Sequence, residues 1–368
     1  MLRMLATHVS SQWRCIYAQM TNSKPCYSDN LSCTNSDIDI VYLWCDGADP
    51  AFNLQRIETL KKFNLPWVED NLGAHRYASD DELLYSLRSV EQNIPWINHI
   101  FIVTNNQRPP WLADHPKITV VDHREIIPPE LLPTFNSTVI EMFIHKIPGL
   151  SEKFIYLNDD MYINAPLSPD FFFDGDKPII RMKAGDEIVR PQSIEDCQRM
   201  LDDSSVSDFR KIQLRAWKIV KEKNENVDWV VCSHVADSYT KTICAVCEKK
   251  YPEMFQCNRF PFRDGTQVQQ RLLVLLEMIS GMGIPYQRID KQLTFFVKHF
   301  GSFFEKTIDC FEGTACDKNR KRILRLKPKL FCLNADIKMD KGNRNKTKEF
   351  LSELFCKASS FEKTAQHH

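Results

Sequence analysis

Short apolar runs alternate along the chain with segments whose apolar residues recur every three or four positions. The runs are rich in β-branched and aromatic residues and are typical of buried strands, whereas the second pattern predicts helices packed on a core. We expect strands at Ile38–Trp44, His99–Asn105, Lys117–Asp122, Lys153–Asp160, Pro178–Met182 and Lys329–Asn334, and helices from Leu83 and at Thr138–Ile147, Ser238–Tyr251, Thr266–Ser280 and Glu349–Cys356. This alternation predicts an α/β fold with a mainly parallel sheet and helices on both faces.

The chain divides by composition into a leader, one large domain and a tail. Residues 1–36 are rich in Ser, Asn, Thr and Cys without periodicity, which predicts a loose leader. Residues 37–336 are interpreted as one α/β domain, and its polar stretch at about 187–230 has the apolar spacing of a helical insertion. Residues 337–368 are expected to form a C-terminal helix and tail.

Two helix starts are predicted from capping-box spacing, an S/T-x-x-E pattern just before an apolar periodic segment. The first joins Ser79 to Glu82, and the second joins Thr138 to Glu141. Both patterns place the helix N-terminus at the Ser or Thr.

Charge and composition argue against several classes of protein. The 48 Lys and Arg balance the 48 Asp and Glu, so no overall charge favours a nucleic-acid partner or an anionic membrane. The chain has 11 glycines and contains no G-x-G-x-x-G, G-x-x-x-x-G-K-[ST] or H-E-x-x-H. This argues against a dinucleotide-dependent oxidoreductase, a P-loop ATPase and a zincin protease. No apolar run is long enough to span a bilayer, and the first residues lack a signal-peptide core. We therefore expect a cytoplasmic protein whose 13 cysteines are reduced.

Polar residues stand at the carboxyl ends of the predicted strands, where an open parallel sheet forms its ligand crevice. They are Asp46, Asn105, Asp122 and Asn158-Asp159-Asp160. Two adjacent carboxylates repel unless a proton or cation lies between them, and Mg²⁺ typically binds through one or two carboxylates and substrate phosphates. The alternative is an exposed turn or a helix cap, where Asp is common.

Three further groups are candidates for chemistry. His234 follows an apolar run and could act as a general base, since imidazole titrates near neutral pH. Arg263 could bind a phosphate through its planar guanidinium. Cys244 and Cys247 form a C-x-x-C, but without a second pair we interpret them as the apolar face of a helix rather than as zinc ligands.

Four segments, taken in order, resemble the Stealth family, which includes bacterial capsule polymerases and an animal N-acetylglucosamine phosphotransferase. They are Ile38–Pro50, Arg76–Asp160, His234–Gly265 and Leu330–Asp336, and the second is the most specific. Two departures stand out. Asp237 takes the place of the second histidine of the family's H-x-P-H, and Ala335 follows Asn334 where the family usually has an aspartate.

The resemblance implies a Rossmann-like, glycosyltransferase-like catalytic domain over residues 37–336. It implies transfer of a sugar-1-phosphate from a nucleotide-sugar donor to a hydroxyl of a glycan acceptor, in capsule or cell-surface polysaccharide synthesis. A nucleoside monophosphate would be released. It further implies Mg²⁺ or Mn²⁺, no nucleic acid, at most peripheral membrane association and a capsule-assembly complex as a partner. Two alternatives stay open: a Mg²⁺-dependent glycosyltransferase that releases a nucleoside diphosphate, and an inactive carbohydrate-binding relative.

The resemblance also implies roles for single residues. Asp159 and Asp160 would hold the cation, with Asn158 or Asn334 completing its shell, while Arg263 would stabilise phosphate oxygens and His234 would accept the proton of the acceptor hydroxyl. The implied substrate-binding residues are Asp46, Gly47, Arg88, Asn105, Asn136, Ser137, Glu141, His145 and Asn158. For Arg88 the alternative is an exposed helix face, and for Glu141 and His145 it is an i,i+4 pair on one helix.

Overall fold

The computed structural model describes residues 37–64, 73, 76–184, 190–289, 309–334 and 341–363. The predicted leader at residues 1–36 lies outside the described residues, as does Ala335, which stands where the family usually has an aspartate. Everything below concerns the described ranges.

A five-stranded sheet forms the centre of the domain, with strand order β10-β4-β1-β2-β3. Its strands are β10 (Asp237–Thr240), β4 (Lys153–Asn158), β1 (Ile38–Leu43), β2 (Ile100–Thr104) and β3 (Ile118–Asp122). All neighbours are parallel except β10, which runs antiparallel to β4 at the edge. The prediction of a mainly parallel α/β sheet is therefore confirmed.

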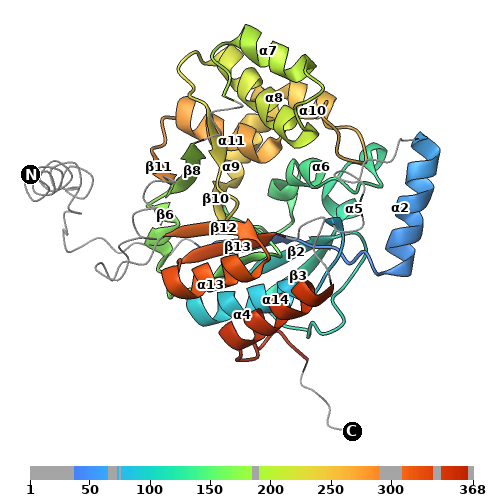
Figure 1. The fold of residues 1–368 in the computed structure, drawn as a ribbon, viewed down its shortest axis with the longest axis vertical. Coiled ribbons are helices and arrows are strands. Elements are labelled where there is room, and N and C mark those ends of the chain that lie inside the picture. Colours follow the sequence, from blue (N-terminus) through green and yellow to red (C-terminus); the bar gives the residue numbers. More distant parts are fainter. Residues whose placement is uncertain are drawn as a thin grey trace, which may run out of the picture. The chain divides into compact units, whose positions relative to one another are not determined.

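Helices cover both faces of this sheet (Figure 1). Alternate strand residues point to opposite faces, so that Val41 and Tyr156 belong to one core cluster while Ile40 and Leu157 belong to the other. The second cluster includes α4 (Glu82–Asn93). The first cluster includes residues of α6 (Ser137–Glu141), α7 (Ile194–Asp202), α8 (Asp208–Lys223), α9 (Lys241–Lys250) and α11 (Gln270–Ser280). The two helices α7 and α8 lie within the range predicted for the helical insertion.

Two small sheets flank the central one. One has the order β12-β13-β5, with β12 (Cys310–Thr314), β13 (Leu330–Asn334) and β5 (Met161–Ile163). The other has the order β11-β8-β9, with β11 (Tyr286–Ile289), β8 (Ile180–Ala184) and β9 (Val230–Cys232). The remaining named elements are α2 (Pro50–Phe63), α5 (His123–Ile126), α10 (Pro252–Cys257), α13 (Asp317–Leu326), α14 (Lys341–Leu354), the hairpin β6 (Phe173–Asp174) and β7 (Lys177–Pro178), and three short 3₁₀ turns.

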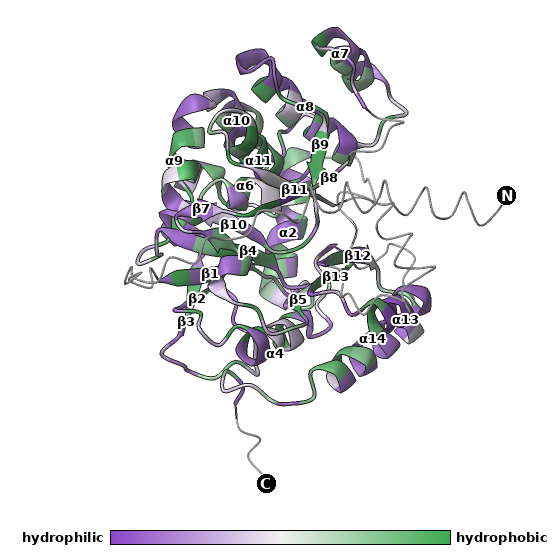
Figure 2. Ribbon diagram, turned by 90° about the vertical axis from the view of Figure 1, so that its left-hand side faces the viewer, coloured by the Kyte–Doolittle hydropathy of each residue, from purple (hydrophilic) through white to green (hydrophobic). Residues whose placement is uncertain are grey.

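Hydropathy separates the inside from the outside of the domain. Figure 2 shows hydrophobic residues gathered on the central strands and inner helices, and mostly hydrophilic ones on outer helices such as α13. No helix among the described residues is both long enough and apolar enough to cross a membrane.

The structure corrects three local predictions. The N-cap of α4 is Asp81, without a side-chain cap, so Ser79 and Glu82 do not form a capping box. The N-cap of α6 is Asn136, whose side chain accepts from the Thr138 backbone, so Thr138 does not start the helix. The predicted helix at Ser238–Tyr251 begins as the edge strand β10, because residues 237–240 pair with β4 before α9 starts.

Candidate active site

The carboxyl ends of β1 and β4 meet at one edge of the central sheet. Leu43 at the end of β1 lies in register with Asn158 at the end of β4. The loop containing Asp46 therefore starts beside the turn Asp159-Asp160, which leads from β4 into β5. The register of β1 and β4 thus places the predicted substrate-binding residue Asp46 near the predicted cation ligands Asp159 and Asp160.

Three carboxyl groups form an acidic cluster at this edge: Glu82, Asp159 and Asp160. Burial and the neighbouring Asp160 raise the pKa of Asp159 to about 8. Burial, with a contribution from Glu82, raises the pKa of Asp160 to about 7, and burial together with Asp159 raises that of Glu82 to about 7. Asp160 Oδ1 is buried and has no hydrogen-bond partner among the described residues. The cluster is therefore short of positive charge, as expected of a cation site.

The donor set of this cluster suits a hard cation. Mg²⁺ prefers oxygen ligands and uses few protein carboxylates, and the unpartnered Oδ1 of Asp160 supplies a free oxygen. Asn334 stands at the end of β13, with its Oδ1 3.6 Å from the Cys332 sulfur. The chain's own oxygen donors therefore fit Mg²⁺ or Mn²⁺ at Asp159 and Asp160.

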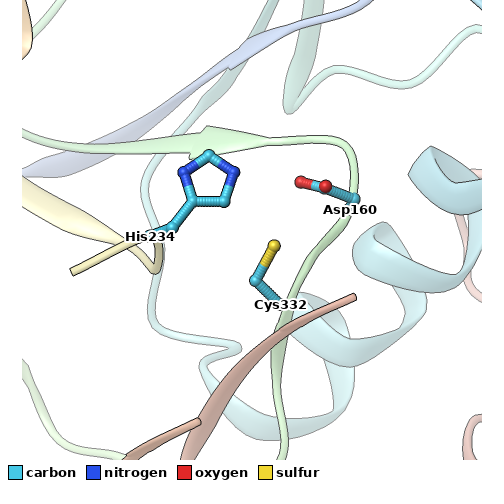
Figure 3. A group of neighbouring side chains, drawn as sticks. All are labelled: Asp160, His234 and Cys332. Carbon is cyan, nitrogen blue, oxygen red and sulfur yellow. The ribbon is translucent and has the colours of Figure 1, made fainter. Parts of the chain in front are cut away.

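His234 and Cys332 lie beside Asp160 (Figure 3). One ligand-type atom from each of the three residues lies within 4.8 Å of the others. The three come from different parts of the chain: the β4–β5 turn, the β9–β10 loop and β13. Burial and the nearby Asp160 raise the pKa of the Cys332 thiol well above its usual range, and the thiol donates to Asn334 Oδ1 at 3.6 Å.

Arg271 holds His234 from the side opposite the acidic cluster. Its Nη1 lies 3.1 Å from His234 Nδ1. Burial and the Arg271 charge lower the pKa of His234 to about 3, so the ring is neutral. The backbone N–H of His234 donates to Glu312 Oε2 at 2.7 Å. The sequence predicted His234 as a general base; that role stays a prediction, and the contact with Arg271 weighs against it.

Arg263 is a half-buried residue that contacts the start of α6. Its Nη2 donates to Ser137 Oγ at 3.0 Å, and its Nε has no hydrogen-bond partner among the described residues. Burial and Arg76 lower its pKa to about 9, while Glu141 opposes that shift. A half-buried guanidinium with a free N–H can donate to a phosphate oxygen.

Asn136 fixes the loop that carries Arg263. Its amide nitrogen donates to Gln267 Oε1 at 2.8 Å and to the Phe262 carbonyl at 3.3 Å, and its Oδ1 accepts from the Thr138 backbone at 3.1 Å. Asn136 is 1% exposed, so these contacts use up its hydrogen-bonding groups. The structure therefore places Asn136 as a support for Arg263.

Glu141 is connected to the acidic edge through Tyr156. The Tyr156 hydroxyl lies 3.1 Å from Glu141 Oε1 and 2.9 Å from Asn158 Oδ1. Burial raises the pKa of Glu141, and Arg271 and Arg263 oppose that shift. Glu141 and Asn158 thus belong to the same polar network as the predicted site.

Three other predicted substrate-binding residues are engaged by protein partners. Arg88 Nη2 forms an ion pair with Glu362 at 2.7 Å, and its Nη1 donates to the Phe355 carbonyl at 3.0 Å. His145 Nε2 lies 2.9 Å from Glu248 Oε2, and Asn105 donates to Gln55 Oε1 at 2.8 Å. The alternative of an i,i+4 pair between Glu141 and His145 is wrong, because α6 ends at Glu141 and His145 lies in a separate 3₁₀ turn.

The Asp46-Gly47 loop is held tightly against a neighbouring segment. Asp46 Oδ1 accepts from the Ala48 backbone at 2.8 Å, and Gln107 Nε2 donates to the Asp46 carbonyl at 2.8 Å. The Gly47 N–H donates to the Tyr77 carbonyl at 2.6 Å, and a Cβ on Gly47 would lie 2.6 Å from that same oxygen. Only glycine fits there without a shift of the backbone.

Several residues at the site were not predicted from the sequence. Glu82 was interpreted as a cap, whereas its carboxylate belongs to the acidic cluster. Arg271, Glu312 and Cys332 sit in ordinary helix or strand patterns, and only the fold shows that they surround His234. The cysteines that the structure describes are all free; Cys244 and Cys247 are buried in the first core cluster, so C-x-x-C marks an apolar helix face as predicted.

Comparison with known proteins gives one family match and a set of relatives. Residues 76–180 match the sequence model of Stealth protein CR2, conserved region 2. An exopolysaccharide phosphotransferase of Streptomyces coelicolor is 36% identical over 234 residues, which cover 63% of this chain and 38% of the relative. The capsular polysaccharide phosphotransferase cps1A of Actinobacillus pleuropneumoniae is 41% identical over 166 residues, 45% of each chain. The chain thus spans less than half the length of these curated relatives.

Among solved structures, the chain is similar to the galactosyltransferase LgtC in complex with donor and acceptor sugar analogues. The TM-score is 0.41 at 11% sequence identity, and the match covers 89% of this chain and 98% of that chain.

Proposed function

Because the chain is related to the Stealth family of bacterial phosphotransferases through its conserved region 2, we propose that it transfers a sugar-1-phosphate from a nucleotide sugar to a glycan hydroxyl. The relatives' names give the reaction class, phosphotransfer in capsular or exopolysaccharide synthesis. The nucleotide-sugar donor, the glycan acceptor and the phosphodiester product are the finer parts of this proposal.

The reaction requires an oxygen of the acceptor hydroxyl to bond to the phosphorus that carries the sugar. The bond from that phosphorus to the oxygen of the nucleoside monophosphate breaks in line, and the hydroxyl proton is lost. A bound Mg²⁺ or Mn²⁺ would neutralise charge on the diphosphate oxygens. Within this chain, Asp159 and Asp160 would hold that cation, and Arg263 would donate its free Nε–H to a phosphoryl oxygen.

The observation that carries the proposal is the acidic cluster at the sheet edge. Three carboxyl groups with raised pKa values lie there beside a neutral histidine, and the half-buried Arg263 acts on that histidine as a positive charge. A binding-only protein has no need for such an arrangement, because it leaves buried groups unsatisfied and lowers stability.

The test is incubation of the protein with UDP-, GDP- and CMP-sugars, Mg²⁺ and glycan acceptors, followed by mass spectrometry of the released nucleotide. We expect a nucleoside monophosphate, formed only with a divalent cation and abolished in Asp160→Asn. Asp114→Asn is the matched control, since Asp114 is fully exposed and forms an ion pair with Arg108 on the surface. Release of a nucleoside diphosphate would instead favour a glycosyltransferase, and carbohydrate binding without turnover would favour an inactive relative.

A further inference from the structure

His234 contacts the guanidinium of Arg271, and the other contacts of this guanidinium hold Arg271 in place. Arg271 Nε forms an ion pair with Asp237, and its Nη2 donates to the carbonyls of Ser233 at 2.7 Å and Val235 at 2.8 Å. The side chains of Arg271 and Asp237 are 6% and 2% exposed. Arg271 therefore grips the residues on both sides of His234, and its remaining nitrogen, Nη1, reaches His234 Nδ1.

This contact decides which ring nitrogen of His234 carries the proton. A guanidinium has only N–H donors and keeps its charge in proteins, so it cannot accept a hydrogen bond. In the 3.1 Å contact, Nδ1 must therefore be the acceptor and bear a lone pair. A neutral imidazole has one N–H, which then lies on Nε2.

The Nε2 side of the ring faces the reactive edge. Figure 3 shows the ring nitrogen remote from the His234 backbone on the side of Asp160. Arg271, Lys183 and Arg263 act on His234 as positive charges, while the carboxyl groups near the ring are those of Glu312 and Asp160. A protonated nitrogen in this position donates a hydrogen bond; it offers no lone pair to a proton or a metal ion.

We propose that Arg271 fixes His234 as the neutral Nε2–H tautomer, and that His234 acts in the reaction as a hydrogen-bond donor to a phosphoryl oxygen. This inference rests on the proposed function and replaces the role of general base that the sequence suggested. His234 keeps its proton throughout. As the acceptor oxygen bonds to phosphorus and the nucleoside monophosphate leaves, the hydroxyl proton passes to a carboxylate of the acidic cluster. Arg271 is a positioning residue, because it acts only through His234.

The tautomer can be read directly in the full chain. The protein is labelled with ¹⁵N-histidine, and the two ring nitrogens of His234 are assigned by the loss of their signals in His234→Gln. At pH 7.5 we expect one protonated nitrogen, Nε2, and one unprotonated nitrogen, Nδ1. A proton on Nδ1, alone or together with Nε2, overturns the proposal. This measurement does not depend on turnover, so it is separate from any failure of the proposed function.

Two substitutions of His234 separate a donor from a base. Gln places an amide N–H close to the position of Nε2 but cannot take up a proton, whereas Ala removes both properties. Loss of one donor to a developing anion typically lowers turnover about 10²–10³-fold. We expect that loss in His234→Ala and a loss of no more than about tenfold in His234→Gln. Equal losses in both variants, with thermal unfolding unchanged, would show that His234 is not a donor.

The role of Arg271 is tested with its buried partner removed as well. In Arg271→Met/Asp237→Asn, neither charge is left unpaired in the core, which protects folding. We expect His234 in this variant to show a mixture of both neutral tautomers, because the Arg271 donor to Nδ1 is gone and no other described residue replaces it. A folded variant that keeps the pure Nε2–H form would refute the positioning role. The wild-type spectrum decides the tautomer even if this variant does not fold.

Discussion

Replacement of Asp159 by Asn is expected to stabilise the cation-free protein at alkaline pH. The folded state raises the pKa of Asp159 from 3.8 to about 8, through burial and the adjacent Asp160. A folded-state pKa above the unfolded value means that the folded protein binds the proton more tightly. The free energy of unfolding therefore falls as pH rises from about 4 to about 8, and an uncharged Asn escapes that loss.

The size of the effect follows from the shift. One pKa unit corresponds to about 1.4 kcal/mol, so a full shift of this kind limits the gain to about 5 kcal/mol at pH 7.5. The Asp159 side chain is only half-buried, which lets water screen part of the repulsion. We expect Asp159→Asn to raise the free energy of unfolding by about 2 kcal/mol at pH 8 in EDTA and by much less at pH 5.

Urea unfolding followed by circular dichroism measures this difference. Wild-type protein should gain about 2.7 kcal/mol with Mg²⁺ at 100 times its dissociation constant, whereas Asp159→Asn should gain little. The exposed control Asp114→Asn should match wild type in both conditions. If Asp159→Asn proves less stable than wild type at pH 8 without cation, the carboxylates do not repel one another and the electrostatic reasoning is wrong.

Three further substitutions test the supports of the site. Asn136→Ala should lower the free energy of unfolding by about 3 kcal/mol in urea, because it removes a helix cap and leaves buried partners unpaired; a loss below about 1 kcal/mol would contradict this. Gly47→Ala should destabilise the fold by about 1–3 kcal/mol in the same assay, since its Cβ would clash with Tyr77, and an unchanged midpoint would show that the loop yields. Arg88→Met should cost about 1–2 kcal/mol through the lost Glu362 pair, with an unchanged KM for the donor; a raised KM would instead support the predicted donor contact.

The sequence predicts the central fold well because strand signals there are local. The runs that became β1, β2 and β4 are buried strands of apolar and β-branched residues, and β3 has the same composition although only its Val121 is buried. The polar residues that follow these strands indicate the reactive edge. Short strands such as β5 and β9, with three residues each, give no comparable signal. Their pairing is decided by tertiary contacts.

The site is only partly predictable for a related reason. Asp159 and Asp160 stand out because they follow a strand. Arg271 lies in the first turn of α11, a helix whose residues 270–278 are all buried, and the sequence does not show which groups it contacts there. Glu82 matches a capping box, yet Asp81 adopts a left-handed backbone conformation, φ 67°, that does not place a cap. Which charged residue faces which other depends on helix packing, and a single sequence does not encode that locally.

The acidic turn, the histidine and the thiol of Figure 3 come from positions 160, 234 and 332. A nascent chain leaving the ribosome can complete the strands through β4 early, but it has no histidine against Asp160 until much more of the polypeptide has emerged. The last member, Cys332, arrives later still. Closing such long loops is slow and entropically costly. Truncated translation products should therefore fold the central sheet but show no enzymatic activity. In a series of stalled ribosomes, activity should appear only in the longest chains.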